Sequence, residues 1–165
     1  MAAESLAALE RGGCALARGP RLHVRVPADW PADGEKRIGY VSILRLIESV
    51  RELHWRRDVG PHADPARVDS ITRALTADFV GPVLGGTQVV GDYALTWVKS
   101  RSYGLRVTIA DAGGHDLARV DLASVFVDPG TLRPVVPDPQ LPAALRDFLP
   151  PPGPGVAGDP RASSP

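Results

Sequence analysis

Two groups of residues in the first third of the chain have the types and spacing to do chemistry. The first is the segment ADWPADGEKR, residues 28–37, where Asp29 and Asp33 flank Trp30 just ahead of a long apolar segment. If that segment is a helix, the loop lies beside free backbone N–H groups and the positive end of the helix dipole. Such a place suits a carbonyl oxygen or a developing oxyanion. The alternative is an ordinary turn with an aspartate that caps the helix.

Glu48 is the second group, and it lies inside the apolar segment. At ~100° per residue it falls on the border of the apolar arc of a helix. Arg51 follows at i+3, close enough to pair with it. The two residues could form a buried or half-buried ion pair that fixes the helix. Glu48 could instead be a carboxylate that faces an active-site cleft, or it could simply be exposed.

The segment that must position both groups runs from Ile38 to Trp55, IGYVSILRLIESVRELHW. Its apolar residues recur at the i, i+3, i+4, i+7 spacing of one helical face, and further apolar residues leave only a narrow polar stripe. A helix of this kind is normally buried. The recurring residues are Ile43, Leu46, Ile47, Val50 and Leu53.

The other convincing segments predict strands, so we expect a sheet wrapped around the helix. DAGG, residues 111–114, predicts a hairpin turn. We expect Ile71, Leu75, Ala77 and Phe79 to share one face, and likewise Val89, Tyr93, Leu95 and Trp97. The predicted strands are 21–27, 67–79, 87–99, 103–110 and 115–128, followed by a short helix at 141–148.

Composition limits the function classes. The chain has 165 residues, 44% of them apolar, and this fits one domain. We expect a flexible leader at residues 1–19, a domain at 20–149, and a disordered Pro/Gly/Ser tail at 150–165. Basic and acidic residues number 19 each, and no basic block argues for a nucleic-acid partner.

Other classes of site are disfavoured by the residues present. No apolar run approaches the ~20 residues that cross a bilayer. The N-terminus lacks the basic-then-apolar order of a signal peptide, so we expect a cytoplasmic location. Cys14 is the single cysteine, which rules out an internal disulfide and a Cys-based zinc site. With no ligand cluster and no phosphate-binding glycine pattern, we expect neither metal nor cofactor.

The order strand, loop, long helix and four antiparallel strands resembles the hotdog fold, an α+β fold in which a curved antiparallel sheet of about five strands wraps around one long central helix. The segment ADGEKRIGYVSILRLIESVREL is similar to the loop and helix of the 4-hydroxybenzoyl-CoA thioesterase-like superfamily. There, a D-x-D-x-x-G-H-V-N-N motif leads into a helix that ends E-x-x-R. Asp33 matches the second Asp, and Glu48 and Arg51 match E-x-x-R.

The likeness extends from about residue 21 to residue 148. DFVGPVLGG resembles the family's passage between its second and third strands, and ARVDLASVFVDPGTLRPVVPDPQL resembles its last strand and tail. The motif also departs from the family. Pro31 replaces the first Asp, Lys36 replaces the Gly, and residues 37–40 read R-I-G-Y where the family has H-V-N-N.

The resemblance implies a thioester hydrolase that acts on acyl-CoA or acyl-carrier-protein substrates. Asp33 is then the leading catalytic carboxylate and Glu48 the second. Gly39 and Tyr40 would supply backbone donors at the helix start. Arg37 would polarise the carbonyl or pair with a phosphate of CoA or the carrier.

Other parts of the resemblance concern the acyl pocket and the assembly. The faces that bear Ile43, Ile47 and Trp97 could line an acyl pocket, or they could simply pack the core. Hotdog domains usually pair their sheets edge to edge, so a homodimer or homotetramer is expected. The lost H-V-N-N keeps a second hypothesis open, a non-catalytic hotdog protein that binds an acyl group or a partner subunit. A hotdog lyase or dehydratase is less favoured, because the loop contains no His.

Overall fold

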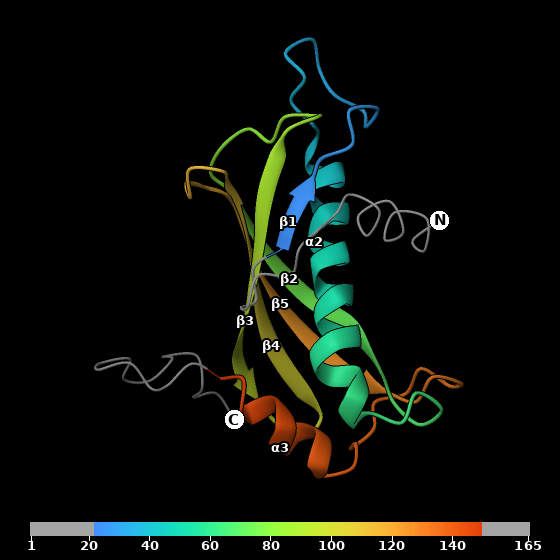
Figure 1. The fold of residues 1–165 in the computed structure, drawn as a ribbon. Coiled ribbons are helices and arrows are strands. Elements are labelled where there is room, and N and C mark those ends of the chain that lie inside the picture. The colour runs from blue at the N-terminus through green and yellow to red at the C-terminus, as the bar shows by residue number, and fades with distance from the viewer. Residues whose placement is uncertain (1–21, 150–165) are drawn as a thin grey trace, which may run out of the picture.

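The computed structural model describes residues 22–149, which form a curved five-stranded sheet with a long helix along its concave face (Figure 1). Every strand pairing is antiparallel, and the strand order is β1-β3-β4-β5-β2. The elements are β1 (Leu22–Arg25), α2 (Tyr40–His54), the π-helical turn η1 (Trp55–Val59), the 3-10 turn η2 (Gly60–His62), β2 (Asp69–Phe79), β3 (Gln88–Val98), β4 (Ser102–Asp111), β5 (Asp116–Val127) and α3 (Gln140–Arg146).

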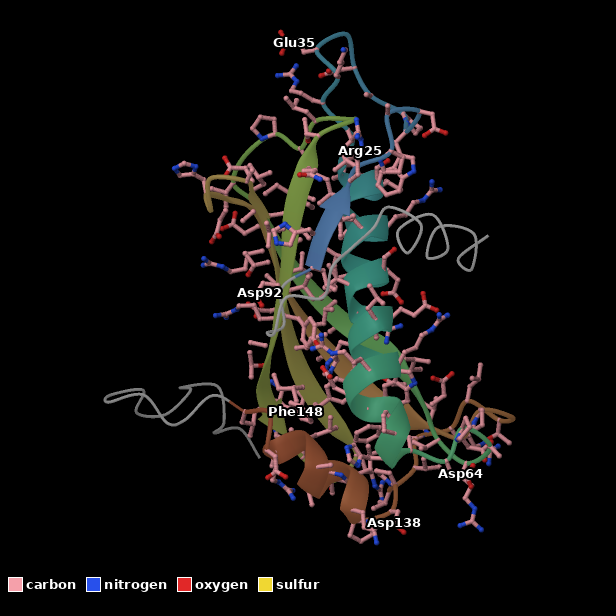
Figure 2. The ribbon with its side chains drawn as sticks, viewed as in Figure 1. Arg25, Glu35, Asp64, Asp92, Asp138 and Phe148 are labelled. Atoms are coloured by element: carbon pink, nitrogen blue, oxygen red, sulfur yellow. The ribbon has the colours of Figure 1, made fainter. Side chains whose placement is uncertain are left out.

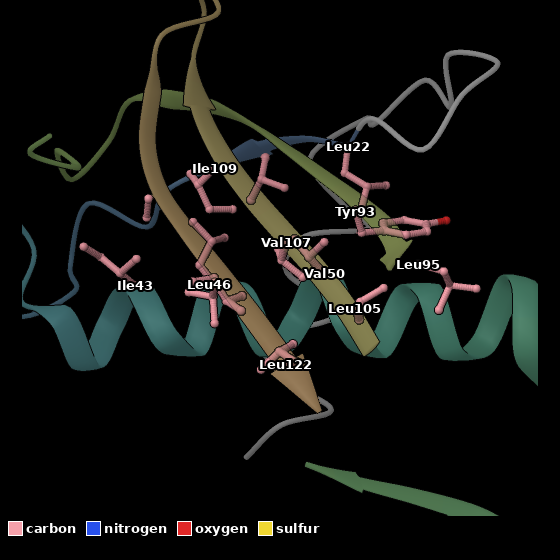
Figure 3. Close-up of a cluster of buried hydrophobic side chains, with 14 of the residues drawn as sticks. Leu22, Ile43, Leu46, Val50, Tyr93, Leu95, Leu105, Val107, Ile109 and Leu122 are labelled. Atoms are coloured by element: carbon pink, nitrogen blue, oxygen red, sulfur yellow. The ribbon is translucent and has the colours of Figure 1, made fainter. Parts of the chain in front are cut away.

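The core lies between α2 and the strands that it crosses. The apolar stripe of α2 is directed at the middle of the sheet, and Leu46 and Val50 lie in one cluster with residues of β3, β4 and β5 (Figure 3). The strand residues include Leu95, Leu105, Val107 and Leu122. Full burial of each such aliphatic side chain stabilises the fold by roughly 1.5–3 kcal/mol. The helical periodicity of the sequence therefore predicted the face of α2 that holds the sheet.

The predicted faces of two strands are wrong beyond a β-bulge. In β2 the register shifts between Thr72 and Ala74, so Leu75 and Phe79 lie opposite concave-face residues of β5 while Ile71 lies on the convex face. In β3 the shift falls between Leu95 and Trp97, which places Trp97 on the convex face. One extra residue reverses the alternation of all residues that follow it. Trp97 therefore cannot line a pocket beneath α2.

The helical chain continues beyond its predicted end. The predicted helical segment ends at Trp55, but η1 and η2 extend the helical turns to residue 62. The π-helical turn brings Asp58 and Val59 into the interior. A widened turn of this kind is rare and often occurs at functional sites.

The prediction of a helix buried over most of its circumference is only partly met. Ile43, Leu46, Ile47 and Val50 are buried in the core, but the start of α2 is not. Tyr40 is 64% exposed there.

No helix within residues 22–149 is long and apolar enough to span a membrane. The predicted leader and tail lie outside the described residues.

Candidate functional site

The loop ahead of α2 is an ordered hairpin. Ala32 and Ile38 form an isolated antiparallel bridge, and Lys36 takes a left-handed backbone conformation with φ 62° at the turn. The hairpin is fixed to the β2–β3 connection, because Ile38 N–H donates to Val83 and Gly85 N–H donates to Lys36. Its tip, marked by Glu35, projects beyond the ends of the helix and sheet (Figure 2). The sequence therefore builds a fixed support for Asp33.

The Asp33 carboxylate is held within this hairpin. One oxygen accepts the backbone N–H groups of Glu35 at 2.9 Å and Arg37 at 3.0 Å. The other accepts Arg37 Nε at 2.7 Å. The hydrogen bond from the Arg37 side chain, followed by its backbone N–H, holds the pKa of Asp33 below its ordinary value. Asp33 is therefore ionised at neutral pH, in the state that a general base or a nucleophile needs.

The N-terminus of α2 opens onto free space beside this loop. Gly39 is the N-cap residue, and its carbonyl accepts the first N–H bonds of the helix, from Ser42 and Ile43. The N–H groups of Tyr40 and Val41 precede these bonds and belong to the first, unpaired turn of the helix. A Cβ atom added at Gly39 would meet nothing within 4 Å. The helix therefore starts beside open space at Gly39. The sequence predicted Gly39 and Tyr40 as the backbone donors, and that role stays a prediction.

Glu48 is held by Arg51 further along the same helix. Arg51 Nε lies 3.0 and 2.9 Å from the two Glu48 carboxylate oxygens. The Glu48 side chain is 55% exposed and that of Arg51 only 13%. Burial alone would lower the pKa of Arg51, but the bonds to Glu48 outweigh it and the pKa is raised. The ion pair expected from the i, i+3 spacing is thus present, with its carboxylate half facing outward.

An exposed apolar surface begins at the helix start. Tyr40 and Val41 lie on α2, and Leu75 and Phe79 lie on the concave face of β2; all four are exposed. The Tyr40 and Phe79 ring centroids are 6.5 Å apart. We call these four residues the apolar lane. Exposed apolar side chains gathered in one place mark ligand or partner surfaces more often than isolated ones do.

Comparison with known proteins bears on the fold. No protein-family model and no curated protein matches the sequence. Among solved structures, the PA5185 protein of Pseudomonas aeruginosa matches with a TM-score of 0.67 at 16% identity, over 78% of this chain and 90% of that chain. Slr0204, a 1,4-dihydroxy-2-naphthoyl-CoA thioesterase from Synechocystis, matches with a TM-score of 0.64 at 14% identity, over 78% and 96%. SAV2348 of Staphylococcus aureus, solved with CoA, matches with 0.67 at 8% identity, over 79% and 85%.

The chain has the hotdog fold. Further structures that match over most of this chain carry the names probable, putative or predicted thioesterase. The resemblance noted in the sequence is thereby confirmed at the level of the fold. At these low identities the likeness extends to the fold alone, so the chemistry of this hotdog domain must be argued from its own residues.

The hotdog interior also holds a polar cluster that sequence reasoning missed. Asp58 in η1 accepts hydrogen bonds from Tyr93 on β3 and from Arg57, and its Oδ2 lies 3.0 Å from His54 Nδ1. His54 is 1% exposed, and burial lowers its pKa although Asp58 opposes this. Burial and the bond to Asp58 raise the pKa of Tyr93. The i, i+4 spacing of His54 and Asp58 was the available signal, but the predicted end of the helix concealed it.

The five predicted site residues fall into two places on the hotdog scaffold. Asp33, Arg37, Gly39 and Tyr40 lie in the hairpin and the start of α2. Glu48 lies two turns further along, bonded to Arg51. Asp33 and Arg37 are bonded to each other in the hairpin, and Gly39 and Tyr40 follow them in the chain at the start of α2. The two carboxylates, Asp33 and Glu48, are each bonded to a different arginine. No group of three metal-ligating side chains occurs within residues 22–149.

Proposed function

We propose that this hotdog protein hydrolyses thioesters of acyl-CoA or acyl carrier protein. The observation that supports this best is the open N-terminus of α2, with the ionised Asp33 in the hairpin before it and the apolar lane starting beside it. Free helix N–H groups and a carboxylate are parts that thioester hydrolysis needs, and an exposed apolar surface beside them suits an acyl chain. Two of the structural neighbours also point towards CoA, one by its name and one by its bound ligand.

The proposed reaction begins with the thioester carbonyl at the helix start. Its oxygen accepts hydrogen bonds from the N–H groups of Tyr40 and Val41, and the acyl chain lies along the apolar lane. Asp33 removes a proton from a water molecule, which attacks the carbonyl carbon. The tetrahedral oxyanion is stabilised by the same N–H groups and the helix dipole. Its collapse breaks the C–S bond, and the proton returns to the departing thiolate.

Arg37 and Glu48 have subordinate roles in this proposal. Arg37 keeps Asp33 ionised and, with about half of its side chain exposed, can also meet a phosphate of the substrate. Glu48 is the second candidate for the catalytic carboxylate. Both of its oxygens are engaged by Arg51, so it acts only if that ion pair opens.

The proposed assembly is a homodimer formed through β2, or a homotetramer of such dimers. β2 is an edge strand of 11 residues, whereas the strand at the opposite edge, β1, has 4. A long unpaired edge is a ready template for pairing with another chain. A partner subunit at this edge would cover the apolar lane and convert it into a tunnel.

The test offers purified protein a panel of acyl-CoA and acyl-carrier thioesters while the free thiol is followed. We expect thiol release by the wild type and a loss of about a hundredfold or more in kcat for Asp33→Asn. Asp29→Asn is the matched control, because Asp29 is an exposed aspartate in the segment just before the hairpin. Glu48→Gln tests the second candidate. Release that persists in both Asp33→Asn and Glu48→Gln would overturn the catalytic assignment.

A second candidate function is a non-catalytic hotdog protein that binds an acyl group. It is favoured by one feature, the engagement of both Asp33 oxygens by Arg37 and the hairpin N–H groups. In that case no thioester in the panel releases thiol. Isothermal titration with a non-hydrolysable acyl-CoA thioether would still show binding, and Val41→Asp would weaken it.

A further inference from the structure

An open groove lies at the same end of the sheet as the hairpin that holds Asp33. The connection between β2 and β3, residues 80–87, forms one wall, and the tip of the β4–β5 hairpin, residues 111–117, forms the other (Figure 1). Its volume is about 790 Å³, and small-molecule sites have volumes of roughly 300–1,000 Å³. The described residues that line it include none of the proposed site residues and none of the apolar lane. We call it the end groove.

Both walls of the end groove are held by hydrogen bonds. Gly81 N–H, in the first wall, donates to the Leu117 carbonyl of the second wall at 3.0 Å. Within the first wall, the Thr87 hydroxyl donates to the Leu84 carbonyl at 2.7 Å. In the second wall, Asp111 Oδ1 accepts two backbone N–H groups of the hairpin turn. The groove therefore exists before a ligand arrives, so binding does not have to order it.

An arginine and a glutamine without partners stand side by side in the groove. Arg25, at the end of β1 (Figure 2), lies directly opposite Gln88 on β3, and both residues are exposed. Residues in this relation point to the same face, with Cβ atoms about 5 Å apart. Neither side chain makes a hydrogen bond or an ion pair with another residue of the described part of the chain. A guanidinium and an amide NH₂ together can donate to a carboxylate.

The rest of the groove is mostly apolar. Leu84 and Pro82 belong to the first wall and are exposed, and Leu84 is 37% exposed. Leu117 belongs to the second wall and is half-buried. Apolar side chains left open to water beside an unpaired cation suit a ligand with an anionic end and an apolar body.

The charges in the groove decide which anion fits. Among the described residues that line it, only Arg25 and Asp111 are charged. Hydrogen bonds from the backbone and ring of His115 hold the pKa of Asp111 below its ordinary value, so Asp111 is ionised. A polyphosphate would meet this negative charge with a single cation to bind it. A monocarboxylate needs only the one cation that the groove supplies.

We propose that the end groove is a binding site for an apolar monocarboxylate, such as a medium-chain fatty acid. The carboxylate accepts hydrogen bonds from Arg25 and Gln88, and the alkyl chain lies against Leu84 and Leu117. This site is separate from the proposed hydrolytic site and does not depend on hydrolysis.

Isothermal titration with acetate, hexanoate and decanoate tests the proposal. We expect the wild type to bind decanoate several-fold more tightly than hexanoate, because the longer chain covers more of the apolar walls, and not to bind acetate measurably. Arg25→Gln should weaken decanoate binding about fivefold or more, and Arg25→Lys, which keeps the charge, should weaken it less. Arg67→Gln is the matched control, because Arg67 is an 86% exposed arginine outside the groove. No decanoate binding by the wild type, or equal binding by Arg25→Gln, would overturn the proposal.

Two further titrations separate the end groove from other sites for the same ligand. Val41→Asp places a charge in the apolar lane and should leave the Arg25-dependent binding of decanoate unchanged. Loss of decanoate binding in Val41→Asp, with normal binding in Arg25→Gln, would place the acid in the lane instead. Adenosine 3′,5′-bisphosphate tests for a phosphate ligand. Arg25-dependent binding of this nucleotide without binding of decanoate would show that the ligand class is wrong.

The outcome is independent of the hydrolase proposal. Thiol release from the thioester panel should be the same for Arg25→Gln and the wild type, because Arg25 lies outside the proposed hydrolytic site. Decanoate binding that depends on Arg25 in a protein that releases no thiol would support the groove and contradict the hydrolase. Thiol release without such binding would do the reverse.

Discussion

Gly39 and Gly34 both have open space where a side chain would be, but only Gly39 lies at the proposed binding position of the thioester carbonyl. A Cβ atom at either position would meet nothing within 4 Å, and neither has a positive φ. Gly39 stands at the proposed oxyanion position, whereas Gly34 lies at the turn of the hairpin. We expect Gly39→Ala to melt like the wild type yet lose about tenfold in kcat, because its methyl group enters the space of the carbonyl. Gly34→Ala, the matched control, should keep its turnover. Wild-type turnover by Gly39→Ala would show that the substrate carbonyl does not bind at the start of α2.

His54 makes the stability of the fold depend on pH. Asp58 oxygen can only accept, so Nδ1 carries the histidine proton, and Nε2 is buried without a partner. Burial lowers the pKa of folded His54 below its ordinary value of 6.5, against the opposing bond to Asp58. As the pH falls below 6.5, the unfolded chain therefore takes up a proton that the folded chain resists. Stability is full above that pH and declines on acidification.

Urea denaturation at pH values of about 8 and about 5 measures this decline. The wild type should lose free energy of unfolding between the two, and His54→Gln should lose clearly less. Arg57 and Arg51 strengthen the effect because both cations disfavour a charged His54. His23→Gln, on the exposed side of β1, should follow the wild type. Parallel pH profiles for His54→Gln and the wild type would contradict this account.

The close approach of α2 to β3 depends on a single glycine. A Cβ atom at Gly91 would lie 2.8 Å from Val50 Cγ2 on the helix. We expect Gly91→Ala to reduce the free energy of unfolding by about 1–3 kcal/mol, because the side chain overpacks a filled core. Gly130→Ala, where the nearest atom would be 3.5 Å away, is the control. The double variant Gly91→Ala/Val50→Ala should lose less than the two single losses combined, and strict additivity would show that the contact does not matter.

At the scale of elements, periodicity predicted which segments are strands and helices but not where a strand changes face. Alternation over residues 71–79 and 89–97 looked continuous, and only the pairing with β5 and β4 shows the extra residue in each strand. The π-helical turn is a similar case. Its polar residues Arg56, Arg57 and Asp58 resemble a loop in sequence, yet Asp58 is buried by partners on other elements. The spacing of residues within one segment does not reveal hydrogen bonds that the segment makes to strands far away in the sequence.

At the scale of the whole molecule, the order of elements was enough to predict the hotdog architecture, and the loop-and-helix motif placed four of the five candidate residues at one end of it. The polar cluster of His54, Asp58 and Tyr93 could not be predicted in the same way. Tyr93 is an ordinary strand residue until the fold brings β3 beside the end of the helix, where its hydroxyl donates to Asp58. Single residues with a chemical motif can be found by spacing, whereas a cluster made by contacts between distant elements requires the structure.

The assembly is the last property at this scale, and it follows from the unequal edges of the sheet. Ala74 and Thr76 lie on the convex side of the long edge strand β2 and are exposed. Lysines on an edge strand prevent pairing with another chain.

Multi-angle light scattering measures the assembly. We expect the wild type to show twice the mass of one chain, or four times that mass for a tetramer of dimers. The double variant Ala74→Lys/Thr76→Lys should show the mass of one chain. The monomeric variant should also lose thiol release, because the apolar lane then stays open to water. His23→Lys on the short edge β1 should remain oligomeric and active. A wild type that is monomeric at working concentration, or a monomeric variant with full turnover, would show that β2 does not complete the site.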